Sequence, residues 1–295
     1  MMASTLISRR AMLAGGAVMM AAPARALSRG IAVIDWGLLE TLLALGLKPA
    51  AATELIQFRR LVIEPPLAPG VVDLGLRGAP NYELLQMLRP DRIVISNFYE
   101  AKRRPLERIA PVVSYTLFRP GASPYALAVE AARGLGATFD RVDAATRLIA
   151  RAENEIVAAR RDLARFAGRP VFIVGLGDAR HFQAFGSDSM FGDVLSRIGV
   201  TNAWPSETRY SAAAPVGLEA LAAVPDAAVI IVAPLPPDVR RSLASNAIWQ
   251  ALPAVRSRRI AVIEPVNHFG GLPAAQRFVR LFARAMSGME RASHG

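Results

Sequence analysis

Two parts of the sequence carry the same pattern, and this repetition is the strongest constraint on the fold. In each part a glutamate opens a helical stretch, a Pro-Asp pair follows, and a short apolar run comes next. The first copy extends from Glu83 to Ile95 and the second from Glu219 to Val232. Short and almost wholly apolar runs are typical of strands buried in parallel sheets. The repeat therefore predicts two α/β lobes of the same kind.

The stretch between the two copies predicts how the lobes are joined. Residues 140–166 contain neither glycine nor proline, and apolar residues recur along them at helical spacing. About 27 residues at about 1.5 Å each would span about 40 Å, enough to reach from one lobe to the other. An ordinary surface helix of one domain is the alternative, but the position between similar halves favours a bridge. We expect an N-terminal lobe at residues 27–138, an interlobe helix at 139–167 and a C-terminal lobe at 168–295.

Residues 1–26 have the features of an export signal and are set apart from the fold. Ser8 to Leu13 form a twin-arginine pattern, a weakly hydrophobic run follows, and residues 24–26 read Ala-Arg-Ala, as at a cleavage site. An ordinary Sec signal is the alternative. Either signal predicts export to a bacterial periplasm. The chain has no cysteine, so we expect neither a disulfide nor a lipid anchor at the cleavage site.

Composition agrees with a soluble two-lobe protein. The chain has 295 residues, of which 53% are hydrophobic, and no apolar run beyond the signal is long enough to cross a bilayer. Loss of the signal lowers the formal net charge from +11 to +8, because three arginines and no acid leave with it. A positive cleft that attracts an anionic ligand is one interpretation of this charge, and genomic base composition is the other. We expect no nucleic-acid partner, because an exported protein rarely meets nucleic acid.

Little in the sequence supports catalysis or a metal site built from side chains. The chain has three histidines, at His181, His268 and His294, and no cysteine. It contains no H-E-x-x-H, CxxC or G-x-S-x-G pattern. Gly175 to Gly177 follow a predicted strand, but the third glycine of a dinucleotide loop is missing, so a tight turn is expected there. We therefore expect no enzyme, no cofactor and no metal ligands.

The stretch from residue 73 to residue 111 is the best candidate for a binding site. Asn81 is a favourable N-cap for a helix at 82–88, and an apolar strand follows at 92–95. Open α/β sheets usually bind ligands beyond the carboxyl ends of their strands. Tyr99 follows the strand and Arg77 precedes the helix, so we expect both side chains to reach one opening. The segment 54–70, which contains Arg59 and Arg60, is predicted to be a long loop at the rim of this opening.

A series of short motifs runs along the chain in a fixed order and spacing. They are Asp35-Trp36, 42–46, Gly75-Leu-Arg77, Pro80-Asn81, Glu83, Pro90-Asp91, Tyr99, 108–111, Arg180-His181, Phe185-Gly186, Gly199, 202–204, Glu207-Thr208 and 278–280. In these motifs the sequence resembles the periplasmic iron(III)-hydroxamate siderophore-binding proteins of ABC importers, and the resemblance covers nearly the whole mature chain. It implies a fold like that of the class III periplasmic binding proteins, with two Rossmann-like lobes, small parallel sheets and one long interlobe helix.

The resemblance also implies a set of ligand contacts. Arginine and tyrosine at the motif positions of Arg77 and Tyr99 bond the hydroxamate oxygens in that family. A salt bridge of Arg77 to Asp73, and a core position for Tyr99, are the structural alternatives. The other expected ligand-binding residues are Trp36, Trp204, Tyr210, Asn267 and His268. Asn267 stands where the family has a tryptophan, which bears on the siderophore that fits, and a core position is the alternative for Trp204.

Two acids are implied as contacts to a transporter. In the family, one acidic residue of each lobe docks on arginines of the inner-membrane permease, and the matching residues here are Glu83 and Glu219. Simple stabilisation of a helix start by a carboxylate is the alternative. We thus expect a monomer that carries a preformed ferric siderophore to an ABC permease with its ATPase. The remaining hypotheses are another iron chelate such as a catecholate or citrate, haem or a corrinoid, an azide-metal or zinc-binding protein, and an exported two-lobe enzyme.

Overall fold

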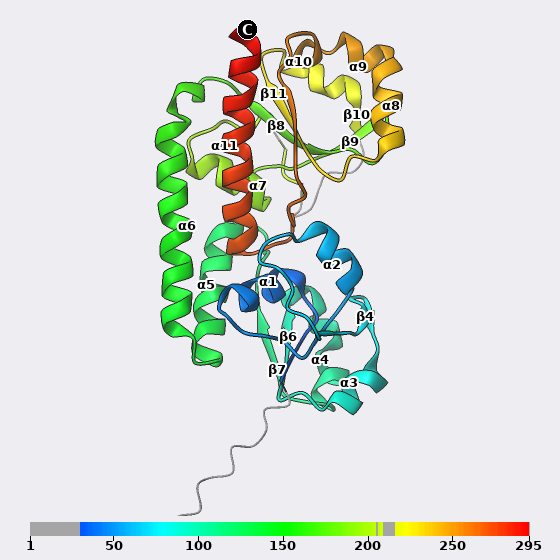
Figure 1. The fold of residues 1–295 in the computed structure, drawn as a ribbon, viewed down its shortest axis with the longest axis vertical. Helices are drawn as coiled ribbons and strands as arrows, with labels where there is room; N and C mark the ends of the chain where they lie inside the picture. The colour runs from blue at the N-terminus through cyan, green and yellow to red at the C-terminus, as the bar shows by residue number, and fades with distance from the viewer. Residues whose placement is uncertain (1–29, 205, 209–215, 295) are drawn as a thin grey trace, which may run out of the picture.

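The computed structural model describes residues 30–204, 206–208 and 216–294. These residues form two α/β lobes that are stacked along the long axis of the molecule (Figure 1). The predicted export signal at residues 1–26 lies outside the described residues. No helix in the described part of the chain is both long and apolar enough to cross a membrane.

The N-terminal lobe contains a five-stranded, wholly parallel sheet with the strand order β3-β2-β1-β6-β7. Its central strands β1 and β6 are apolar and almost completely buried, which fits a sheet covered on both faces. A separate antiparallel hairpin follows β3. The strands are β1 (Ile31–Val33), β2 (Ala51–Ala52), β3 (Val72–Asp73), β4 (Gly75–Leu76), β5 (Ala79–Pro80), β6 (Arg92–Ser96) and β7 (Val112–Tyr115).

Two helices of this lobe, α1 and α3, begin at polar caps that the sequence supplies. The Asp35 side chain accepts from the Leu38 N–H, and the Asn81 side chain accepts from the Leu84 N–H at 2.9 Å, which confirms the predicted N-cap. The segment 54–70 is not a continuous loop as predicted, because a two-turn helix occupies its first half. The helices are α1 (Trp36–Ala44), α2 (Leu55–Leu61), α3 (Tyr82–Leu88), the 3₁₀ helix η1 (Asn97–Lys102), α4 (Arg103–Glu107) and α5 (Pro124–Thr138).

The C-terminal lobe contains a mixed sheet with the order β10-β9-β8-β11-β12. Strands β8, β11 and β12 are parallel, whereas β9 runs antiparallel to β8 and to β10. The expectation of a parallel sheet therefore holds for three strands only. Residues 176–180 are too few for a parallel crossover, so they return the chain in the opposite direction. The strands are β8 (Val171–Gly175), β9 (His181–Ala184), β10 (Val216–Gly217), β11 (Ala228–Val232) and β12 (Ile260–Ile263).

The sequence repeat corresponds to equivalent strands of the two sheets. Strand β6 lies between β1 and β7, and β11 lies between β8 and β12, all in parallel. The helical stretch that Glu219 opens is a 3₁₀ helix and not an α-helix. The helices of the C-terminal lobe are α7 (Met190–Arg197), η3 (Leu218–Ala223), α8 (Pro237–Ser245), α9 (Ala247–Ala251) and α10 (Pro253–Arg256).

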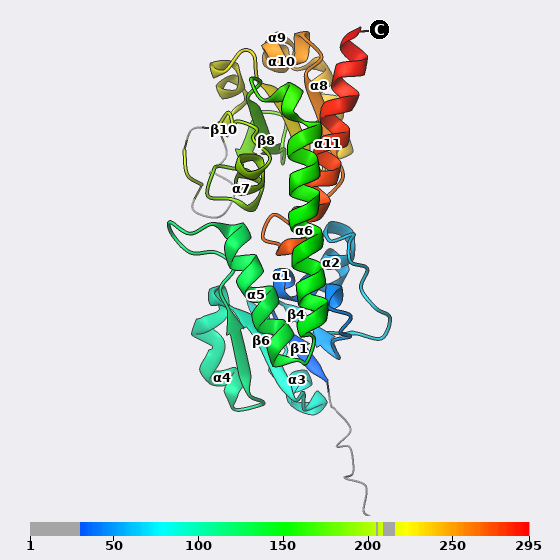
Figure 2. The same cartoon turned by 90° about the vertical axis from the view of Figure 1, so that its left-hand side faces the viewer.

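Two long helices lie side by side along the molecule (Figures 1 and 2). Helix α6 (Val142–Asp162) is the predicted interlobe helix, and it is shorter than predicted because a 3₁₀ turn, η2 (Ala164–Phe166), replaces its last turn. Helix α11 (Leu272–His294) was not predicted. A single hydrophobic cluster extends from Trp36 through α6 to Phe278 of α11 and Ile173 of β8. The lobes therefore share one continuous core.

Candidate functional site

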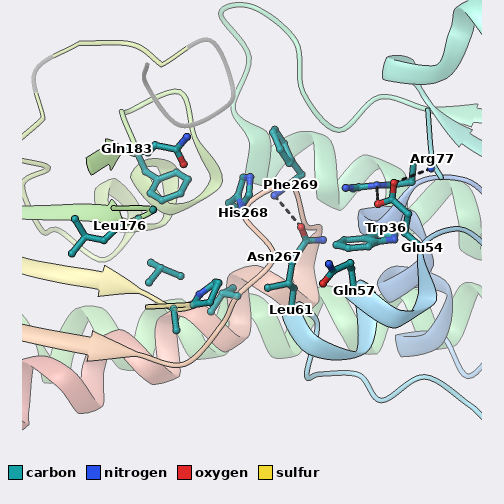
Figure 3. Close-up of a pocket in the computed structure, with 17 residues that line it drawn as sticks. Trp36, Glu54, Gln57, Leu61, Arg77, Leu176, Gln183, Asn267, His268 and Phe269 are labelled. Carbon is teal, nitrogen blue, oxygen red and sulfur yellow. Dashed lines mark hydrogen bonds and ion pairs between the residues drawn. The ribbon is translucent and has the colours of Figure 1, made fainter. Parts of the chain in front are cut away.

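A cleft of about 550 Å³ lies between the two lobes (Figure 3). Its walls come from residues that follow the carboxyl ends of strands in both sheets, which is the usual ligand position in open α/β sheets. A third part of the wall is the segment 264–271, which we call the crossover loop because it connects β12 to α11. The lining residues are Trp36, Glu54, Gln57, Leu61, Arg77, 175–177, Gln183, Phe185, 232–234 and 266–269.

Arg77 is held in a fixed position at this cleft. Its Nε donates to Glu54 Oε2 at 2.7 Å, and its backbone N–H donates to Glu54 Oε1 at 3.0 Å. Its guanidinium carbon lies 4.0 Å from the ring centre of Trp36, a cation–π contact. The side chain keeps 28% of its surface exposed. The terminal amino groups of Arg77 are thus presented by a rigid support, and its ion partner is Glu54 and not Asp73, the alternative raised by the sequence.

Tyr99 lies in a smaller adjoining cavity of about 350 Å³ that it shares with Arg77. Arg77, Glu54 and Phe269 line both cavities, so the two form one continuous site. Burial, with the charge of Asp35, raises the pKa of Tyr99 to about 12, although the nearby Arg77 opposes this shift. The phenol is therefore a neutral hydrogen-bond donor at neutral pH. The predicted meeting of Arg77 and Tyr99 at one opening is present in the structure.

Trp36 is the buried residue on which the Arg77 guanidinium packs. Only 4% of Trp36 is exposed, and its indole N–H donates to the Thr53 carbonyl at 2.9 Å. Phe58 packs edge-on against it, with ring centres 5.6 Å apart. These contacts fix the indole plane, so Trp36 acts in the cleft mainly through the guanidinium that it supports.

The crossover loop inserts an aromatic cluster into the cleft. Phe269 contacts Phe98 and Phe118 edge-on, with ring centres 6.0 Å and 5.8 Å away. His268 lies between Phe269 and Phe185, with ring centres 4.3 Å and 5.5 Å away. Burial and the charge of Arg77 lower the pKa of His268 to about 4, so its imidazole is neutral at neutral pH. Figure 3 shows His268 and Phe269 between the Arg77 side of the cleft and Gln183.

The remaining predicted ligand residues are Asn267, Trp204 and Tyr210. The amide of Asn267 turns inward to Glu40 and to the Phe269 N–H, and only 6% of the residue is exposed. Trp204 lines neither cavity but packs edge-on against Phe182 in the core of the C-terminal lobe, with ring centres 5.8 Å apart. Its core alternative fits this geometry better than the cleft position. Tyr210 lies outside the described residues.

Several cleft residues were missing from the sequence-based prediction. Glu54 precedes α2 with a positive φ of 50°, a backbone conformation that is uncommon outside glycine and is enriched at functional sites. Gln57 and Leu61 come from the helix that was read as a loop. Arg59 and Arg60 are exposed and line neither cavity. A helical spacing of Leu55, Phe58 and Leu61 was the available signal for this helix.

Glu83 and Glu219 are exposed in the first turns of α3 and η3, outside the cleft. Within the described part of the chain, no group of three or more His, Cys, Asp or Glu side chains is placed to hold a metal ion. The cleft combines apolar and aromatic walls with one fixed guanidinium, one neutral phenol and two amides. Such an arrangement suits a ligand with an apolar body and electron-rich oxygens on its surface.

Comparison with known proteins shows the family to which the chain belongs. The sequence model of the periplasmic binding protein family matches residues 31–266, which is most of the chain. The chain belongs to this family. It is 33% identical to the iron(3+)-hydroxamate-binding protein FhuD of Escherichia coli K12, over 96% of this chain and 98% of that protein.

Two further relatives show the range of this similarity. The achromobactin-binding periplasmic protein of Dickeya dadantii is 27% identical, over 84% of this chain and 83% of that protein. The crystal structure of the siderophore-binding protein FhuD of Vibrio cholerae, bound to Fe3+-Desferal, has a TM-score of 0.81 at 23% identity. That alignment covers 88% of this chain and 98% of the other, and it supports the two-lobe fold.

Proposed function

We propose that this periplasmic binding protein captures a ferric hydroxamate siderophore in the cleft between its lobes. The observation that carries the proposal is the Arg77 guanidinium, fixed by Trp36 and Glu54 beside the neutral phenol of Tyr99. Hydroxamate oxygens bound to iron keep partial negative charge, and a guanidinium and a phenol donate hydrogen bonds to such oxygens. The similarity to E. coli FhuD over nearly the whole chain supports the same ligand class.

In this proposal the protein contacts the outer surface of the chelate and does not coordinate the iron. All six positions of the metal are expected to be filled by the siderophore. Trp36, Phe269 and Phe185 supply apolar walls, while Gln57 and Gln183 supply amides from opposite lobes. The cleft volume of about 550 Å³ falls within the usual range of ligand pockets.

We further propose that the chain is exported by residues 1–26 and delivers its ligand to an inner-membrane ABC permease. The export signal and the family membership support the periplasmic location. The exposed acids Glu83 and Glu219, one in each lobe, are suited to dock on basic residues of a permease. The chain then acts as a monomeric carrier with residues 27–138 and 168–295 as lobes.

A ferric chelate of another type than a hydroxamate, such as ferric citrate, is the second candidate ligand. The relative from Dickeya dadantii is an achromobactin-binding protein, and Asn267 replaces an expected tryptophan in the cleft wall. An asparagine is smaller than a tryptophan, and its amide turns inward, so the cleft wall leaves room for a chelate of another shape next to Arg77.

Fluorescence titration of the mature chain, from Leu27 onward, tests the ligand class. The chain has three tryptophans, so a Trp204→Phe/Trp249→Phe variant leaves Trp36 as the only indole and as a reporter inside the cleft. A panel would contain a ferric trihydroxamate, its iron-free form, a ferric catecholate, ferric citrate, haem and cobalamin. We expect saturable quenching by the ferric trihydroxamate in both the wild type and the reporter variant. Binding of ferric citrate alone would transfer the proposal to carboxylate chelates, and absence of binding by the whole panel would contradict it.

A further inference from the structure

A carboxyl group without exposed surface lies at the junction of the two lobes. Glu40 is on α1, one helical turn after Trp36, and its exposed fraction is 0%. One oxygen accepts from the N–H groups of Gly271 at 2.7 Å and Ala274 at 3.3 Å, and the other accepts from the Asn267 amide at 3.4 Å. All three donors belong to the crossover loop or to the first turn of α11. Glu40 is thus an N-terminal cap for α11 that is supplied by the other lobe.

The loop is shaped to receive this carboxylate. A Cβ on Gly270 would lie 2.5 Å from Glu40 Oε1, and a Cβ on Gly271 would lie 2.7 Å from Thr41 Oγ1. The two glycines therefore allow the backbone to approach α1 closely. Asn267 continues the chain of contacts, because its Oδ1 accepts from the Phe269 N–H at 3.2 Å. A connected set of hydrogen bonds thus leads from Glu40 through Asn267 to Phe269, whose ring lies in the cleft.

We propose that Glu40 is a positioning residue that fastens the crossover loop to the N-terminal lobe and so holds His268 and Phe269 in the cleft. The proposal rests on the proposed function in one respect, that this cleft is the ligand site. A buried carboxylate is costly, and an apolar side chain would usually stabilise a core at least as well. Its three N–H donors and the helix start that it caps give the acid a specific role in the position of the loop.

The same contact makes the loop sensitive to pH. Burial raises the pKa of Glu40 to about 8, against the effect of its three donors. Among the neighbouring charges, Asp35 on α1 raises this pKa, His268 in the loop is neutral, and Arg277 on α11 is paired with Glu64 and Glu264. A raised pKa in the closed arrangement means that the closed loop binds the proton more tightly than a loop that has opened to water. The closed arrangement is therefore favoured at low pH and is lost as pH rises through about 8.

Hydrogen exchange of the ligand-free protein tests the proposal independently of any ligand. Peptides that span residues 264–275 report on the N–H groups of Gly271 and Ala274, after correction for the intrinsic pH dependence of exchange. In the wild type we expect protection to fall as pH rises through about 8. Glu40→Gln keeps the shape without the charge, so its protection should not change with pH. Glu40→Ala should exchange at least about tenfold faster in this segment, because the Gly271 and Ala274 N–H groups lose their acceptor.

Leu42→Ala is the matched control. Leu42 is as buried as Glu40 but lies on nearly the opposite side of α1, so its truncation destabilises the core without touching the loop. Equal exchange at 264–275 in Glu40→Ala and Leu42→Ala, or equal pH dependence in the wild type and Glu40→Gln, would overturn the proposal. Titration of the same variants with ferric trihydroxamate then separates the two claims. If no chelate binds the wild type, the proposed function fails, while the exchange result still decides the role of Glu40.

Discussion

At the scale of single residues, the proposed recognition of the ligand depends on a guanidinium that the protein itself holds in place. Trp36 supports the flat face of Arg77, and Glu54 binds its edge through Nε. A side chain that is already ordered loses little further conformational entropy when the ligand binds. Because Glu54 occupies only the Nε–H and the backbone N–H, the terminal amino groups stay available to Tyr99 and to the ligand.

Tyr99 is expected to act as a neutral donor and not as an iron ligand. Its pKa of about 12 keeps the phenol protonated throughout the neutral range in the absence of metal, and the siderophore is expected to fill all six positions of the iron. The visible absorption of the bound ferric hydroxamate should therefore equal that of the free complex. Tyr99→Phe should weaken binding about 2- to 10-fold, the value of one neutral hydrogen bond.

Tyr115→Phe is the control for this prediction, because its hydroxyl bonds to Thr138 outside both cavities. A new phenolate-to-iron absorption band on binding, lost in Tyr99→Phe, would show that the residue coordinates iron.

Residue-level prediction succeeded where a motif marked the position and failed where contacts are distant in sequence. Arg77 and Tyr99 flank one helix and one strand, so local pattern was enough to place them at one opening. Glu54 lies 23 residues before Arg77 and Glu40 lies 231 residues before Gly271, and no local pattern indicates these partners. Trp204 could not be assigned from sequence, since an indole suits a core and a cleft equally well.

At the scale of elements, α11 connects more of the molecule than the predicted interlobe helix does. It packs on α1, α5, α6 and α7, and two of its arginines make ion pairs with three other segments. Arg277 pairs with Glu64 and Glu264, and Arg280 pairs with Glu64 and Glu155 of α6. The helix was not predicted, although α6 was, because α6 lies between the two copies of the repeat whereas α11 lies beyond the second copy.

Removal of Arg277 should loosen the junction of the lobes. Only 6% of its side chain is exposed, so truncation removes the ion-pair partner of Glu264, leaves Glu64 with Arg280 alone and removes a bond to the Pro265 carbonyl. We expect Arg277→Ala to lower the free energy of unfolding by about 1–3 kcal/mol in urea denaturation. Arg284→Ala, at an exposed position of the same helix, should change it by less than about 0.5 kcal/mol. Equal stability of the two variants would contradict a structural role for this ion cluster.

At the scale of the whole molecule, the lobes are joined at two places by rigid contacts. Helix α6 crosses between them once, and the crossover loop returns from the C-terminal sheet to α1 before α11 begins (Figure 1). Together with the shared core, these contacts predict only a small closure when a ligand binds. The two-lobe plan was predictable because the repeat and the bridging helix are local patterns. The antiparallel strands β9 and β10 were not, since they have only four and two residues.

The proposed docking acids should affect transport without affecting ligand binding. Glu83 and Glu219 are exposed and lie outside the cleft, so charge reversal leaves the binding residues unchanged. We expect Glu83→Lys and Glu219→Lys to bind ferric hydroxamate like the wild type but to reduce iron uptake in cells several-fold, through like-charge repulsion at the permease. Glu130→Lys, at an exposed position of α5, is the control. Normal uptake by the double variant would rule out these acids as docking contacts.

Calorimetric titration of ferric trihydroxamate into the wild type, Arg77→Ala and Arg60→Ala tests the central claim most directly. Arg77 lines both cavities, whereas Arg60 is an exposed arginine that lines neither. A charge-assisted hydrogen bond contributes about 1.5–3 kcal/mol, so Arg77→Ala should bind about 10- to 100-fold more weakly. Arg60→Ala should bind like the wild type. Equal affinity of Arg77→Ala and the wild type would contradict the account, because the fixed guanidinium would then play no part in recognition of the ligand.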